Sequence, residues 1–292
     1  MKKIIFAILA LFVFATPCFA ELKIAATLPW IGSIAKEIGK DKVNVITLVK
    51  PGQDPHFVEA KPSMTVAARN ADIVMFNGLE LEAGYLPLII TSSRNPKIQP
   101  GQKGSFDASR YVNAIEKLES ADRSMGDVHP LGNPHYHLSP SNIGRVAKGI
   151  AETLSEVDPV NADFYGKNLV SFKERLKERQ AQWAGKLKGK RFIAFHKYFE
   201  YLANEFGFQI IGYIESKPGI PPSSSHIARL TETIRTTKAD AILSTAYYGK
   251  KEVEFLSQKT GIKGLVVPHE VGCQDGIKDW FTLMDSVVDS LK

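Results

Sequence analysis

Hydrophobic residues along this chain of 292 residues fall into short apolar runs that alternate with longer stretches of helical spacing. The short runs predict strands, and apolar residues repeating every three or four positions between them predict helices. The first half contains three such runs, at 22–26, 43–49 and 71–76. The second half contains four, at 191–195, 208–214, 239–244 and 264–267. Because strands alternate with helices, we expect an α/β fold with two lobes, each a central, mostly parallel sheet flanked by helices.

The first twenty residues differ from the rest of the chain. Two lysines precede an apolar run at 4–14 and a stretch that ends in Ala20, which is the pattern of a secretory signal peptide. The run is too short to span a bilayer. Cys18 raises the question of a lipid anchor, but Pro17 stands where that signal needs a small residue, so we expect cleavage after Ala20 and no anchor. Cys273 is then the only cysteine left, which excludes an intrachain disulfide and is compatible with a bacterial periplasm.

A long helical pattern separates the two halves. It begins after Asp158 and continues to about Leu187. About 28 residues at 1.5 Å each give roughly 42 Å, which suits a rigid connector between lobes better than a helix inside one. The expected organisation is a signal peptide (1–20), an N-terminal metal-binding lobe (21–157), a connecting helix (158–188) and a C-terminal metal-binding lobe (189–292).

The charge pattern narrows the range of partners. The formal charge of +6 falls to +4 when the two lysines of the signal peptide are removed, and basic residues are interspersed with acidic ones. The sequence has no basic block with interleaved aromatic residues, so nucleic acid is not an expected partner.

Histidines carry the strongest chemical signal. Three of the seven, His129, His135 and His137, fall within nine residues, in a loop stiffened by two prolines. Stiffness lowers the entropy that a ligand loses on binding. Taken alone, the loop is consistent with a metal-binding element and equally with a polar surface loop. For His129, His137 and the isolated His226, the favoured interpretation is a solvated loop residue.

The remaining histidines lie where open α/β sheets bind ligands. His56, His196 and His269 each follow a predicted strand, and the carboxyl ends of strands form the usual ligand crevice. Together with His135, they come two from each half of the chain. A single histidine in such a place is more often an ordinary loop residue, but four so placed indicate one metal site between the lobes.

Several motifs surround these histidines. They are Asp54-Pro55-His56, Gly132-Asn133-Pro134-His135, Phe195-His196 and Pro218-Gly219-Ile220-Pro221-Pro222. With the signal peptide and the long helix, they resemble the metal-binding solute-binding proteins of ABC importers, the cluster A-I family, which deliver zinc or manganese. The resemblance covers essentially the whole mature chain. It implies two α/β lobes joined by a rigid helix, a metal ion between them, and a monomeric periplasmic carrier whose partner is an ABC permease in the inner membrane.

The resemblance also implies the ligands. Carried over residue by residue, it assigns His56, His135 and His196 to the metal. Family members commonly place an aspartate after the last strand, and His269 takes that position here with Glu270 beside it. His269 is therefore the expected fourth ligand, with Glu270 as the alternative and water as a third possibility.

The donor set favours zinc. Neutral imidazoles with at most one carboxylate suit an ion that accepts tetrahedral nitrogen ligands at about 2.0–2.1 Å. Manganese prefers more oxygen. His196 also favours zinc over manganese, because manganese-binding members of the family tend to have glutamate at that position. We expect zinc as the transported ion and manganese as the alternative.

Other function classes have weaker support. A zinc hydrolase needs an open position for water and a general base, for which Glu270 is the sole candidate. The sequence has neither a His-Glu-x-x-His nor a Gly-x-Ser-x-Gly motif. Glu80 and Glu82 precede a helix predicted at 82–90, where the helix dipole favours carboxylates, so we do not interpret them as an acid pair. An adhesin, a role sometimes assigned to family members, is disfavoured by the expected lack of an anchor. We expect no enzymatic activity.

Overall fold

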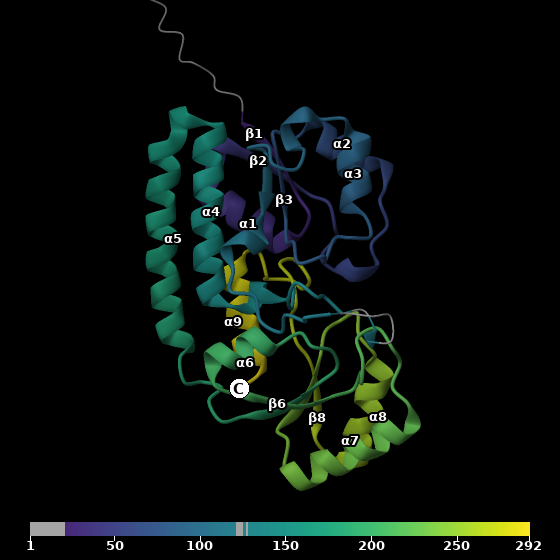
Figure 1. Ribbon diagram of the computed structural model, residues 1–292. Helices are drawn as coiled ribbons and strands as arrows, with labels where there is room; N and C mark the ends of the chain where they lie inside the picture. The colour runs from purple at the N-terminus through teal and green to yellow at the C-terminus, as the bar shows by residue number, and fades with distance from the viewer. Residues whose placement is uncertain (1–20, 121–124, 127) are drawn as a thin grey trace, which may run out of the picture.

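The computed structural model describes residues 21–120, 125–126 and 128–292, so the signal peptide predicted at 1–20 lies outside the described residues. It contains two four-stranded parallel sheets with the orders β2-β1-β3-β4 and β6-β5-β7-β8 (Figure 1). The first sheet consists of β1 (Leu22–Ala26), β2 (Val43–Thr47), β3 (Ile73–Phe76) and β4 (Ser105–Asp107). The second consists of β5 (Arg191–Ala194), β6 (Gln209–Tyr213), β7 (Ala241–Ser244) and β8 (Lys263–Val266). The predicted α/β class with two lobes is confirmed.

Sequence periodicity missed β4. This three-residue strand lies in a segment rich in Gly, Pro and Ser, and it is too short to show alternation. It pairs in parallel with β3, where Met75 is opposite Phe106. Phe106 is 3% exposed, so burial of one aromatic side chain against the core fixes the strand.

Helices cover both faces of the first sheet and line the second. α1 (Pro29–Gly39), α2 (Pro62–Asn70) and α3 (Leu86–Ser93) belong to the first lobe, and α6 (Glu200–Phe206), α7 (Ser224–Thr237) and α8 (Lys250–Thr260) to the second. In β1, Ile24, Ala25 and Ala26 are buried in succession, as expected for a parallel sheet with both faces covered. In the described part of the chain, no helix is long and apolar enough to cross a bilayer.

Two helices run along the side of the molecule as an antiparallel pair (Figure 1). α4 spans Pro140–Val157 and α5 spans Ala162–Trp183. The 22 residues of α5 extend about 33 Å at 1.5 Å per residue, shorter than the expected 42 Å. The difference arises at both ends, because a separate 3-10 turn, Pro159–Asn161, precedes α5 and the helix ends at Trp183, before Leu187.

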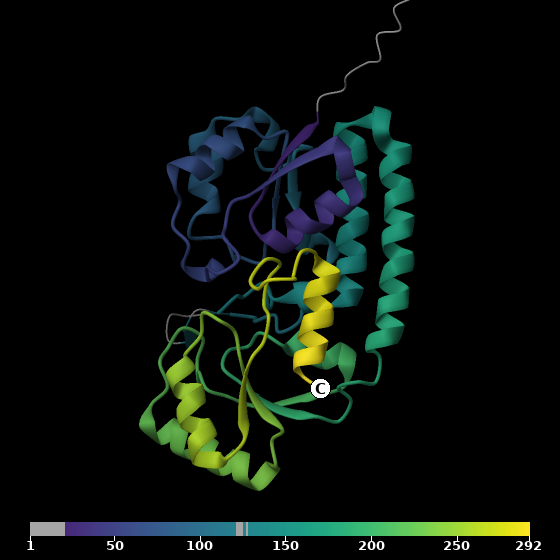
Figure 2. The same cartoon turned by 180° about the vertical axis from the view of Figure 1, so that it is seen from behind.

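The last helix, α9 (Trp280–Ser290), leaves the second sheet and packs back against α5 and α1 (Figure 2). The ring of Phe281 lies 5.0 Å from that of Phe172 on α5. Trp183 donates its indole N–H to Asp285 at 2.8 Å, and Trp280 donates to the carbonyl of His137 at 2.8 Å. The chain therefore passes between the lobes a second time, and α9 ties the histidine-rich loop to the helical side of the molecule.

Candidate metal centre

Three histidines from three loops meet between the lobes. One possible ligand atom from each of His56, His135 and His196 lies within 4.8 Å of the other two. The ring centroids are 5.3 Å apart for His56 and His135, 5.6 Å for His56 and His196, and 5.4 Å for His135 and His196. We call this group the three-histidine centre. These three side chains are close enough together to hold one metal ion.

Carboxylates contact the Nδ1 atoms of two of these rings, on the side of each ring opposite Nε2. Asp54 caps the 3-10 turn Pro55–Phe57, and its Oδ1 lies 2.7 Å from Nδ1 of His56. Glu215, just after β6, places Oε2 2.8 Å from Nδ1 of His196. An acceptor at Nδ1 holds the ring proton there and leaves the lone pair of Nε2 for a metal. The Nε2 atom of His56 is buried and has no hydrogen-bond partner, as a metal-free ligand would.

His135 is the most buried member of the centre. It is 2% exposed, its backbone N–H donates to Oδ1 of Asn133 at 2.9 Å, and its Nε2 is buried without a hydrogen-bond partner. Burial, reinforced by the nearby His56 and His196, holds the pKa of His135 well below its usual range. The ring is therefore neutral over a wide pH range, and a neutral imidazole is the form that binds metal.

A buried carboxylate supports the loop that carries His135. Glu82 accepts hydrogen bonds from Oγ1 of Thr27 and the backbone N–H of Asn77, both at 2.7 Å. Asn77 in turn donates to the carbonyl of Pro134 at 3.2 Å. Burial raises the pKa of Glu82 to about 7. The interpretation of Glu82 as a helix-start residue is wrong, because α3 begins only at Leu86 and Glu82 instead braces the strand ends below the centre.

The structure does not bring His269 into the three-histidine centre. Its Nε2 donates to the carbonyl of Pro51 at 3.0 Å, and its ring packs 4.5 Å from that of Tyr247. Its Nδ1 is buried without a hydrogen-bond partner. His269 and His135 both line a small chamber of about 20 Å³, which is room for one water. Glu270 lines the same chamber.

Glu270 does not join the centre either. Its carboxylate accepts the backbone N–H of Val271 at 2.7 Å, and burial raises its pKa to about 8. A carboxyl group with a raised pKa keeps its proton to higher pH, and the protonated form is a poorer ligand for a cation than the carboxylate.

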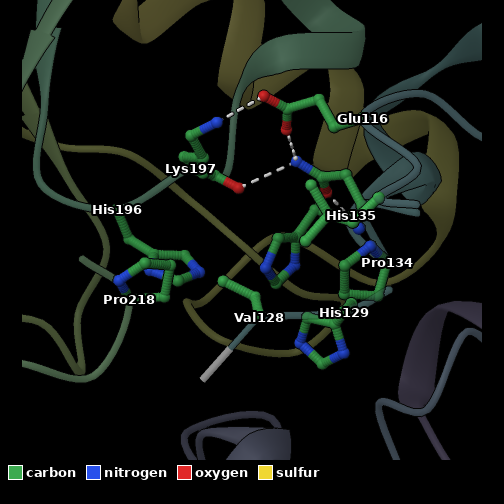
Figure 3. Close-up of a pocket in the computed structure, with 10 residues that line it drawn as sticks. Glu116, Val128, His129, Pro134, His135, His196, Lys197 and Pro218 are labelled. Atoms are coloured by element: carbon green, nitrogen blue, oxygen red, sulfur yellow. Dashed lines mark hydrogen bonds and ion pairs between the residues drawn. The ribbon is translucent and has the colours of Figure 1, made fainter. Parts of the chain in front are cut away.

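The other histidines have different surroundings. His129 lies beside the centre, with its ring 5.2 Å from that of His56, and donates from Nδ1 to the carbonyl of Leu79 at 3.1 Å. With His135 and His196 it lines an open cavity of about 110 Å³ (Figure 3). His137 is 5% exposed, so its interpretation as a solvated residue is wrong. Burial lowers its pKa to about 4, and the ring serves to pack the core.

Comparison with known proteins identifies the family. Residues 24–292 match the family model of ZnuA, the periplasmic component A of the zinc-uptake complex. The chain belongs to this family. The manganese ABC transporter substrate-binding lipoprotein PsaA of Streptococcus mitis is 28% identical over 83% of this chain and 78% of its own length. The iron-binding protein YfeA of Yersinia pestis is 24% identical over 93% and 85%. A crystal structure of ZnuA aligns with a TM-score of 0.77 at 24% identity, covering 93% of this chain and 98% of that one.

Membership in this family confirms the resemblance noted in the sequence. The chain is a metal-binding substrate-binding protein of an ABC importer and not an enzyme, which rules out the hydrolase alternative. Such components function outside the cytoplasm together with a membrane permease. The family is described by zinc and the two relatives by manganese and iron, so the comparisons leave the metal open.

Proposed function

We propose that this protein captures zinc in the three-histidine centre and delivers it to the membrane permease of its importer. The observation that carries this proposal is the donor set: three imidazoles form the group, and within the described residues no carboxylate belongs to it. Nitrogen donors in this number are typical of zinc sites. The carboxylates of Asp54 and Glu215 contact the Nδ1 atoms of His56 and His196. Manganese, which prefers oxygen ligands, is the alternative.

The fourth ligand completes this proposal. His269 remains our candidate because its Nδ1 is buried without a hydrogen-bond partner and the residue lines a chamber that His135 also lines. To bind, the ring has to move toward the centre. If it does not move, water takes the fourth position, as it does in catalytic zinc sites that have three protein ligands. Glu270 is disfavoured by its backbone hydrogen bond and raised pKa.

The proposal also includes how the chain is exported and processed. We infer that the signal peptide is cleaved after Ala20 and that the mature monomer carries no lipid anchor. The relative PsaA is named a lipoprotein, so the case against an anchor rests on Pro17 next to Cys18. Mass spectrometry of the mature chain from its native cell distinguishes cleavage after Ala20 from lipidation at Cys18.

Elemental analysis tests the metal assignment directly. Protein purified without added metal, from cells grown in a medium that contains zinc, manganese and iron, is expected to carry close to one zinc per chain. If the purified chain instead carries about one manganese or iron, the assignment to zinc is wrong. The conclusion that the chain is a component of an ABC importer is unaffected by that result.

The carboxylates behind the rings have a testable role. Asp54→Asn and Glu215→Gln are each expected to weaken zinc binding by roughly 10- to 100-fold, because an amide no longer holds the Nδ1 proton as a carboxylate does. Competition titration against a zinc chelator measures the change. The matched control is Asp240→Asn, since Asp240 accepts the backbone N–H of Arg191 at 2.7 Å at the start of β5, away from the strand ends that carry the centre. Equal affinities for all three variants contradict an orienting role.

A further inference from the structure

Asn133 connects the two loops that carry His135 and His196. Its Oδ1 accepts the backbone N–H of His135 at 2.9 Å, and its Nδ2 donates to the carbonyl of Lys197 at 3.1 Å. Lys197 directly follows His196 in the chain. One side chain, 6% exposed, therefore bonds to the backbone within one residue of a histidine from each lobe.

Charged groups hold this amide in place. Nδ2 of Asn133 also donates to Oε2 of Glu116 at 3.0 Å and lies 3.4 Å from Oε2 of Glu200. The other oxygen of Glu116 pairs with Nζ of Lys197 at 2.6 Å, as the dashed line in Figure 3 shows. The carboxylate of Glu116 thus contacts both the Asn133 amide and Lys197, so the ion pair adds an indirect link between Asn133 and the loop of His196.

The backbone of Asn133 is fixed as well. Its N–H donates to the carbonyl of Ile115 at 2.9 Å, and its carbonyl accepts the hydroxyl of Tyr201 at 2.7 Å. Tyr201 lies on α6, which begins four residues after His196. The backbone of Asn133 is therefore bonded to one residue from each half of the chain, Ile115 and Tyr201.

We propose that Asn133 is a positioning residue that sets the distance between His135 and His196 before the ion arrives. This inference rests on the proposed function. Ligands held at the required spacing lose less conformational entropy on binding, so the gain appears as tighter binding without a new contact to the metal. Asparagine is suited to this role because it offers an acceptor to one loop and a donor to the other.

The isosteric change Asn133→Asp tests the donor half of this link. It removes both N–H groups and places a carboxylate against those of Glu116 and Glu200, while the acceptor for His135 stays. We expect zinc binding at least tenfold weaker than in the wild type, with a less favourable binding entropy measured by calorimetry. Asn133→Ala, which adds no charge, is expected to weaken binding in the same direction and replaces the aspartate variant if that chain does not fold.

Asn168→Asp is the matched control. Asn168 lies on α5 and donates from Nδ2 to the carbonyl of Ile38 at 2.8 Å, so it is also an amide that ties distant segments, but on the side of the molecule away from the centre. Its replacement is expected to lower the melting temperature and leave zinc affinity unchanged. Wild-type affinity and entropy in a folded Asn133 variant overturn the positioning role alone. Absence of zinc binding by the wild-type chain overturns the proposed function and this inference together.

Discussion

Replacing His135 with alanine is expected to weaken zinc binding by roughly two orders of magnitude or more. Structural zinc sites bind with about 10–16 kcal/mol, so each of four ligands contributes on the order of 3 kcal/mol, and 1.4 kcal/mol corresponds to a factor of ten. His135 is the most buried member of the centre, and its Nε2 has no hydrogen-bond partner. Competition with a chelator of known affinity measures the loss.

His226→Ala is the control for this variant. The Nε2 of His226 donates to the carbonyl of Tyr213 at 2.8 Å, and the residue is not part of the three-histidine centre. The His226→Ala variant also lacks one imidazole, but it should bind zinc with the affinity of the wild type. Wild-type affinity in the His135 variant contradicts the proposed site. The same titration on His269→Ala decides the fourth ligand, because a loss similar to that of His135 requires that ring to reach the ion.

Zinc is expected to raise the melting temperature by about 10 °C, and manganese by clearly less. An ion that binds only the folded chain at 1,000 times its dissociation constant adds about 4 kcal/mol to the free energy of unfolding, and each kcal/mol shifts the melting temperature of a chain of this size by roughly 2–4 °C. Nitrogen donors bind zinc more strongly than manganese. Calorimetric melting of metal-free protein with equal concentrations of either ion measures both shifts.

The variants of the centre supply the control for this experiment. In His135→Ala, most of the zinc-dependent shift should disappear, because the stabilisation arises from binding at that place. Equal shifts with zinc and manganese in the wild type refute selectivity for zinc. A zinc shift that survives in the His135 variant points to a second binding place and not to the three-histidine centre.

Sequence pattern was a good guide to the location of the centre. Apolar runs predicted where the strands end, and parallel strands bring their carboxyl ends to one edge of each sheet. Two of the three histidines that the structure brings together, His56 and His196, were picked out by this reasoning, and the Asn-Pro-His motif pointed to His135. That these three bind the ion remains a prediction.

The same pattern could not show which way a ring faces. His269 occupies the expected loop after the last strand, yet its Nε2 bonds to the carbonyl of Pro51, which is 218 residues away in the chain. Likewise, nothing near His196 in the sequence points to Glu215 as the carboxylate behind its ring. Both bonds depend on how two loops meet after folding, and local periodicity contains no such information.

The sequence by itself determined the α/β class, the two lobes and the loops that carry the candidate ligands, because burial imposes a readable period on strands and helices. Only the tertiary structure decided that α9 returns to pack on α5, that Glu82 braces the first lobe from within, and that Asn133 links two ligand loops. Each of these depends on polar or aromatic contacts between residues far apart in the chain. Such contacts form only once the lobes are packed, so the order of residues alone does not reveal them.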